Sequence, residues 1–270
     1  MRLLIILGII LILVNIISEC LIINAKLCKI TYSKTGKFNI SKNRMLRKYV
    51  NYSLINETKT KSICYIFNNN EEIDICFKGS SNIIDIYYNF DIYQKKYLRE
   101  EIKVHNGFLN KYLSIKSKLI EKIKEIINKN DIKIITFNGH SSGGAMAMIA
   151  TLDIRKLIRR DDMIINCITF GSPKISNDGF IEEYNRNINN SYRVIIKTDI
   201  IQYLPFTIGY NHVHEGIIIN DEKDRFNIKR IIVNIYEYFK IKHGISNYIK
   251  GLYRLDNKRF SINEISIRGK

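Results

Sequence analysis

The sequence predicts an α/β fold with a mostly parallel central sheet and helices on both faces. Two observations lead to this fold class. Apolar runs of strand length alternate along the chain with longer runs of helical periodicity, which is typical of parallel α/β domains. The run GHSSG at residues 139–143 then joins one such strand to one such helix. With 270 residues, 46% of them hydrophobic, the chain can bury a full core as one domain.

In the first half of the chain, strands at residues 62–67 and 73–77 predict a hairpin that turns at three consecutive asparagines. A helix is predicted over residues 110–129, where apolar positions recur on one side and lysines lie on the other. Residues 27–57 are mixed in character, and we expect them to be partly helical and to pack behind the sheet.

In the second half, a buried strand is predicted at residues 132–137 and a helix at 144–159, on either side of the GHSSG run. Parallel sheets bind ligands at the carboxyl ends of their strands, where Ser141, Ser172 and Asp199 would all lie. The pattern further predicts strands at 163–170, 192–197 and 213–219, a short helix at 179–187, and an element of uncertain type at 231–241.

Ser141 stands between the predicted strand and helix, in the pattern G-x-S-x-G. Gly139 and Gly143 would let the backbones pack closely enough for a tight turn that exposes the serine hydroxyl. The helix N-terminus behind it favours the negative charge that develops during acyl transfer. A glycine-rich turn can match five residues by chance, but the strand and helix around this one favour a nucleophile.

A nucleophilic serine needs a histidine base, and the base needs an acid to orient it. In α/β hydrolases the chain order is serine, acid, histidine. Asp199 closes an apolar strand, and both His243 and His212 follow it, so the position in the sequence leaves the base open. We expect the His140 side chain to point away from Ser141. The remaining alternatives are His214 as base, Asp178 and Asp221 as loop aspartates that could be the acid, and His105, for which a structural role is expected.

Six motifs occur in a fixed order: FKGSS at 77–81, VHNGFL at 104–109, GHSSGGA at 139–145, FGSPKISN at 170–177, DIIQYLP at 199–205 and YNHV at 210–213. Together they resemble the class 3 lipase family, the filamentous-fungal triacylglycerol lipases and their plant and animal relatives. The similarity extends over roughly residues 62–252, and residues 243–248 fit the late segment that carries the family's catalytic histidine.

The resemblance implies an α/β-hydrolase fold and hydrolysis of lipid carboxylic esters through an acyl-enzyme, without metal or cofactor. In this chain it assigns Ser141 as the nucleophile, His243 as the base and Asp199 as the residue that orients the base. The backbone N–H groups of Ser80 and Ser142, with the Ser80 hydroxyl, would hold the oxyanion.

The resemblance also implies a lid over residues 83–90, a short amphipathic helix that opens at a lipid surface. Its apolar residues would face the lipid or the substrate groove, although an ordinary core helix is the alternative interpretation. These residues are Ile83, Ile84, Ile86, Tyr87 and Phe90.

Three residues depart from the family pattern. Ser142 stands where leucine is usual, and Gln202 stands where proline is usual and could loosen the acid loop. Lys242 precedes His243 where an acidic residue is common, which makes His243 the weakest member of the triad and His212 or His214 the fallback.

A formal net charge of +17 favours contact with an anionic lipid surface, as a peripheral membrane or lipid-droplet protein. The chain has no aromatic-interleaved basic motif or zinc-finger spacing, so nucleic acid is not an expected partner. The expected substrate is a lipid ester. Alternatives to a triacylglycerol lipase-like enzyme are a phospholipase of the A1 type, a non-catalytic lipid-binding protein on the same scaffold, and a peptidase.

Residues 3–17 are apolar and have the length of a signal-peptide core. We expect residues 1–20 to be a signal peptide cleaved after Cys20, which leaves one domain at 21–270 and a secreted protein. An uncleaved membrane anchor is the alternative. Secretion agrees with four glycosylation sequons, at Asn39, Asn51, Asn56 and Asn189.

Four cysteines would remain after such cleavage. Cys64 and Cys76 flank the predicted hairpin turn at equal distances from Asn70, so a disulfide between them is feasible. Cys167, inside an apolar strand, is expected to be a buried free thiol.

Overall fold

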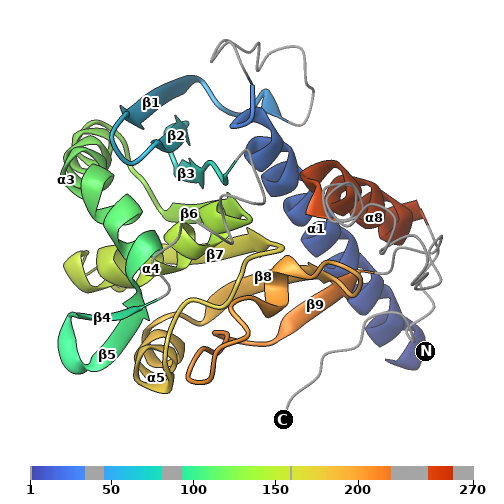
Figure 1. Ribbon diagram of the computed structural model, residues 1–270. Coiled ribbons are helices and arrows are strands. Elements are labelled where there is room, and N and C mark those ends of the chain that lie inside the picture. The colour runs from blue at the N-terminus through green and yellow to red at the C-terminus, as the bar shows by residue number, and fades with distance from the viewer. Residues whose placement is uncertain (1, 34–45, 81–92, 159, 220–242, 258–270) are drawn as a thin grey trace.

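The computed structural model describes residues 2–33, 46–80, 93–158, 160–219 and 243–257. Its centre is a seven-stranded sheet in the order β1-β2-β3-β6-β7-β8-β9 (Figure 1). The first three strands are antiparallel, and each later neighbour pair is parallel. The strands are β1 (Asn51–Glu57), β2 (Ser62–Asn68), β3 (Glu72–Phe77), β6 (Ile134–His140), β7 (Ile164–Phe170), β8 (Asn190–Ile196) and β9 (Gly216–Ile219).

Helices cover both faces of this sheet, which confirms the predicted fold class (Figure 1). On one face lie α3 (Asn106–Lys129), α4 (Ser142–Leu157) and α5 (Asp178–Asn187), whose apolar side chains share one core cluster. On the other face lie α1 (Arg2–Ile30) and α8 (Ile245–Asn257), which pack against each other. α1 covers β3, β6 and β7, and α8 covers β8 and β9.

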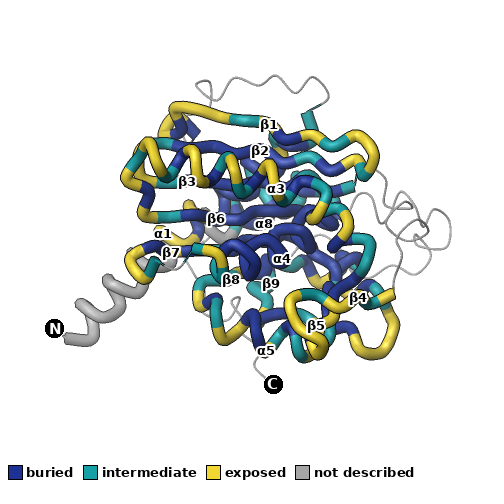
Figure 2. Tube along the Cα trace, turned by 90° about the vertical axis from the view of Figure 1, so that its left-hand side faces the viewer, coloured by how far each residue is buried: buried dark blue, intermediate teal, exposed yellow. Residues whose placement is uncertain are grey.

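The two helices nearest the centre differ in how far they are buried. α4 is buried from Ser142 to Ile154, whereas α3 alternates between buried and exposed positions (Figure 2). This matches the sequence, since α3 carries lysines on one side and α4 has none before its last turn. The strand–helix unit with the GHSSG run is therefore the centre of the molecule.

Besides α1, α8 and the short 3-10 helix η3 (Ile201–Tyr203), three strands were not predicted from the sequence. β4 (Gln94–Tyr97) and β5 (Arg99–His105) form a separate antiparallel pair, and β1 extends the central sheet. β1 falls within residues 27–57, where we expected mixed and partly helical structure. Only Ile55 is buried in this strand, so the alternation that would have indicated it is absent.

The expected disulfide between Cys64 and Cys76 is wrong. Cys64 pairs with Phe77 across the hairpin, and Cys76 pairs with Tyr65. This one-residue offset points the two thiols to opposite faces of the sheet. All five cysteines are free, and Cys167 is a buried thiol as predicted.

α1 runs as one helix through the expected cleavage site at Cys20. The part after this residue is built into the core, because Leu21, Ile22, Ala25 and Cys28 are all buried against β7, β8 and α8. Within the residues that the structure describes, no helix has the length and apolarity needed to span a bilayer. Cleavage after Cys20 remains a prediction.

Candidate active site

Ser141 occupies a tight turn between β6 and α4. Its backbone has φ 60° and ψ −133°, a conformation that non-glycine residues rarely adopt. A Cβ at Gly139 would lie 2.2 Å from the Gly143 carbonyl carbon, and a Cβ at Gly143 would lie 2.2 Å from the Phe77 oxygen. The turn therefore requires both glycines, as the sequence motif predicts.

Asp199 and His243 are hydrogen-bonded. The Nδ1 atom of His243 lies 2.7 Å from Oδ2 of Asp199. The same carboxylate oxygen accepts the Tyr248 hydroxyl at 2.6 Å, and Oδ1 accepts the backbone N–H of Ile201 at 3.0 Å. Asp199 is fully buried, so these bonds replace its contact with water.

These contacts decide the charge of the Asp199 side chain. Burial alone would raise the pKa of this carboxyl, because it disfavours the anion. The charge of His243 and the hydrogen bonds from His243, Tyr248 and Ile201 outweigh burial, and the pKa is lowered. The carboxylate is therefore ionised at neutral pH.

Two polar side-chain atoms of this site have no hydrogen-bond partner among the described residues. They are Oγ of Ser141 and Nε2 of His243, in residues that are 1% and 3% exposed. Hydrogen bonds between catalytic groups are often long or poorly aligned before substrate binds. Both atoms are thus available for chemistry inside a site that excludes bulk water.

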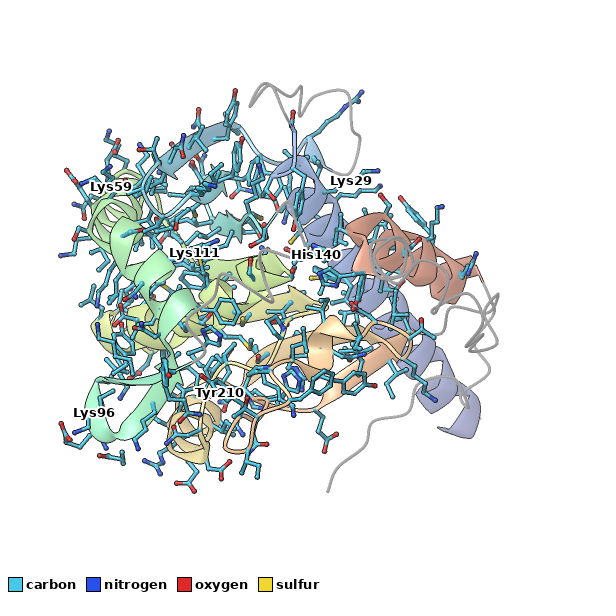
Figure 3. All side chains as sticks on the ribbon, viewed as in Figure 1. Lys29, Lys59, Lys96, Lys111, His140 and Tyr210 are labelled. Carbon is cyan, nitrogen blue, oxygen red and sulfur yellow. The ribbon has the colours of Figure 1, made fainter. Side chains whose placement is uncertain are left out.

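His140 connects the turn to His243. The Tyr32 hydroxyl donates to His140 Nδ1 at 2.8 Å, and His140 Nε2 donates to the His243 carbonyl at 2.7 Å. The rings of His140 and His243 stack at 4.6 Å. Burial, and then the neighbouring His243, lowers the pKa of His140 to about 3, so its ring is neutral. In Figure 3 His140 lies beside α1, which ends just before Tyr32.

The loop after β3 packs directly on this turn. A Cβ at Gly79 would lie 2.2 Å from the Tyr32 hydroxyl and 2.4 Å from the His140 oxygen. The next residue, Ser80, donates its backbone N–H to Oγ of Ser142 at 2.9 Å, and the two hydroxyl oxygens lie 3.1 Å apart. Ser142 replaces the leucine that is usual in the family. Its hydroxyl therefore accepts the Ser80 N–H, one of the two donors expected to hold the oxyanion.

The alternative bases contact neither Asp199 nor His243 by hydrogen bond. His212 bonds the Gln202 carbonyl through Nε2 at 2.6 Å, and His214 bonds the Ile188 carbonyl at 2.7 Å. His105 stacks on Phe108 at a ring distance of 4.1 Å, in agreement with the structural role expected for it. Asp178, which is exposed, accepts from the Asn211 amide.

Gln202 does not loosen the acid loop. Its side-chain amide donates to the Ile196 carbonyl at 2.7 Å and to the Asp199 carbonyl at 2.8 Å, and the side chain is buried. The glutamine therefore ties the loop to the end of β8 by hydrogen bonds. The predicted lid residues 83–90, Asp221 and Lys242 lie outside the described residues.

The sequence did not predict two tyrosines that hydrogen-bond to residues of this site. Tyr32 and Tyr248 reach the site from α1's end and from α8, and no motif singles them out as functional. Both follow or lie within helical stretches, where an aromatic residue reads as part of the core. Among the described residues, no group of three or more histidine, cysteine or acidic side chains could hold a metal ion.

The chain is similar to lipases in sequence. The family described as lipase (class 3) matches residues 75–208, a segment that includes Ser80, Ser141 and Asp199. A secreted mono- and diacylglycerol lipase of Malassezia restricta is 31% identical over 123 residues, which cover 45% of this chain and 40% of that protein. A secreted mono- and diacylglycerol lipase of Fusarium solani is 30% identical over 159 residues, covering 57% and 46%.

A phospholipase A1 of Arabidopsis thaliana is 30% identical over 118 residues, which cover 42% of this chain and 29% of that protein. The matches thus span less than half the length of these curated relatives. Among solved structures, the Rhizomucor miehei triacylglyceride lipase superimposes with a TM-score of 0.68 at 19% identity, over 83% of this chain and 95% of that one. This likeness shows a shared α/β-hydrolase fold. The matched segment, residues 75–208, belongs to the class 3 lipase family.

Proposed function

We propose that this chain is a serine esterase that hydrolyses carboxylic esters of lipids through an acyl-enzyme. The observation that carries the proposal is the buried Asp199–His243 pair, bonded at 2.7 Å, whose histidine stacks on His140, the residue before Ser141 on its strand-to-helix turn. A fold of this kind hosts many functions, so the argument rests on these side chains and on family membership.

In the proposed reaction, Oγ of Ser141 attacks the ester carbonyl while Nε2 of His243 takes the hydroxyl proton. Because Asp199 holds the Nδ1 side of the ring, the unpartnered Nε2 is the nitrogen left for the serine. His243 then returns the proton to the departing alcohol. In the second half, water attacks the acyl carbonyl while His243 takes one of its protons. The bond to Oγ of Ser141 then breaks, His243 returns the proton to this oxygen, and the fatty acid leaves.

The developing oxyanion would be held by the backbone N–H groups of Ser80 and Ser142. The Ser80 N–H is bonded to the Ser142 hydroxyl, so this hydroxyl must rotate away when the carbonyl oxygen arrives. Removal of one oxyanion donor costs about 2.7–4 kcal/mol of barrier in other serine hydrolases. The Ser142 hydroxyl therefore protects the donor before substrate binds and competes with the substrate for it.

The proposed substrates are acylglycerols, because the two matched fungal relatives are named as mono- and diacylglycerol lipases. A phospholipase A1 activity is the second candidate. It is supported by the matched plant relative of that name and by the net charge of +17, which would draw the protein to anionic lipid surfaces.

We further propose that the protein is secreted, as the names of the fungal relatives state for those proteins. Residues 1–20 would serve as the signal peptide, or as an anchor if left uncleaved, ahead of a lipase domain at 21–270. The segment 83–90 would act as the lid at a lipid–water interface, and the sequons would carry glycans.

The deciding experiment titrates fatty acid released from emulsified acylglycerol and, in parallel, from anionic phospholipid vesicles. We expect release that Ser141→Ala abolishes and that Ser114→Ala, a serine change on α3 away from the site, leaves intact. The better substrate would distinguish the lipase from the phospholipase. No release by folded wild-type protein from either substrate would contradict the proposal and favour a lipid-binding role.

A further inference from the structure

Arg193 is a buried cation in the middle of β8. It is 7% exposed, and its Nη1 atom donates to the His214 carbonyl at 2.9 Å and to the Val213 carbonyl at 3.4 Å. Its Nε atom has no partner. Burial lowers its pKa to about 10, and no carboxylate of the described residues offsets this effect. Such a guanidinium remains charged at neutral pH.

Neither residue paired with Arg193 across the sheet bonds its Nε–H. In parallel strands, paired residues share a face of the sheet. Thr169 of β7 is paired with Arg193, is 1% exposed, and its hydroxyl has no hydrogen-bond partner. On the other side, Arg193 is paired with Gly216 of β9, which has no side chain. The Arg193 Nε–H and the Thr169 hydroxyl, two buried polar groups without a partner, thus belong to paired positions of β8 and β7.

His212 lies near Arg193 and is uncharged at neutral pH. Its Nε2 atom is bonded to the Gln202 carbonyl, and its Nδ1 atom has no partner. Burial, followed by the charges of Arg193 and Lys174, lowers the pKa of His212 to about 3. The ring is neutral and presents a lone pair at Nδ1, so His212 adds no charge beside Arg193.

We propose that Arg193 and Thr169 bind a small inorganic anion of the chloride class, which accepts hydrogen bonds from the Arg193 Nε–H and the Thr169 hydroxyl. A buried charge is costly unless a counter-charge or several hydrogen bonds compensate it. Carbonyl oxygens satisfy part of the guanidinium but carry no net charge. The His212 lone pair repels an anion, which places the ion on the Thr169 side of the guanidinium.

The site would stabilise the strand that leads to Asp199, three residues beyond the end of β8. It does not depend on ester hydrolysis, so this proposal and the proposed function can fail separately. The ion must be small, because the residues around it are buried.

The test is thermal unfolding of the purified protein at constant ionic strength, with chloride replaced stepwise by gluconate, which is too large for the site. We expect the Tm to rise by about 3–5 °C for each tenfold increase in chloride above the Kd. In crystals soaked in bromide, an anomalous peak should lie between Arg193 Nε and Thr169 Oγ1. Equal Tm values in the two salts, or only water at this position, would overturn the proposal.

Variants distinguish the site from a general salt effect. Thr169→Val removes one donor at nearly constant volume and should raise the chloride concentration for half-maximal effect by about tenfold. Arg193→Met should abolish the response, whereas Arg160→Met, which removes an exposed arginine, should retain it. If Arg193→Met does not fold, Thr169→Val and the bromide crystal decide; an unchanged chloride response in Thr169→Val argues against the site.

Discussion

Asp199 and Asp74 are both buried carboxylates at the central sheet, yet their surroundings shift their pKa values in opposite directions. Asp74, on β3, accepts the Tyr49 hydroxyl at 2.6 Å and the Asn138 amide at 3.1 Å, but burial prevails and raises its pKa. Asp199 accepts a tyrosine hydroxyl as well, and adds a histidine and a backbone N–H. Tyr49 and Asn138, with the charge of Lys48, do not offset the effect of burial on the pKa of Asp74, whereas His243, Tyr248 and Ile201 together offset it for Asp199.

The largest expected effect comes from Asp199→Asn. The amide cannot stabilise a protonated His243, so we expect kcat/KM on a soluble ester to fall about 10³–10⁴-fold. Asp74→Asn makes the same change in the other buried aspartate and should leave kcat/KM unchanged. Similar losses in the two variants, measured at equal folded fractions, would show that the two aspartates do not differ in role.

A smaller effect is expected from Tyr248→Phe, which removes one donor from Asp199. Hydrogen bonds to charged groups contribute about 1.5–3 kcal/mol, and we expect kcat/KM to fall about tenfold. Tyr49→Phe removes the equivalent donor from Asp74 and should lower the Tm without changing kcat/KM. An unchanged kcat/KM in Tyr248→Phe would mean that His243 and Ile201 suffice to hold the carboxylate.

The smallest effect is a difference in pH dependence. The pKa of Asp74 is raised on folding, so its stabilising contribution is present below the unfolded pKa of about 3.9 and is lost as pH rises through the folded pKa. The pKa of Asp199 is lowered, so its contribution is present above about 3.9 and is lost as pH falls through the folded pKa.

Thermal unfolding between about pH 2 and pH 7 tests this difference. Relative to the wild type, the Tm of Asp74→Asn should improve as pH rises above about 3.9, whereas that of Asp199→Asn should improve as pH falls below about 3.9 and stay level above it. Tm differences that stay constant over the whole range in both variants would contradict the opposite shifts.

Much of the fold and of the candidate site could be predicted from patterns of consecutive residues. The strand, the GHSSG run and the helix after it are consecutive in the chain, so Ser141 could be placed on its turn from sequence. Asp199 could be placed at the end of β8 for the same reason. The hairpin of β2 and β3 could also be predicted from the sequence, but its register could not. Both strands are buried along most of their length, so a shift of one residue leaves their apolar pattern almost unchanged.

Contacts between distant residues could not be read in this way. Tyr32 meets His140 across 108 positions, and Tyr248 meets Asp199 across 49. A tyrosine in or beside an apolar helix has the same pattern whether its hydroxyl serves a core or a site. The packing of residues 21–28 into the core was hidden by the apolar run before them, which reads as a leader.

The bond from Tyr32 to His140 and the bond from His140 to the His243 carbonyl span nearly the whole chain, with 108 and 103 positions between partners. A ribosome makes these residues in order, so the turn with Ser141 exists well before the histidine it is proposed to need. The contacts are nonlocal and form late in folding, because long loops must close first. If the proposed function holds, an unfinished chain carries the serine without the histidine and should lack esterase activity.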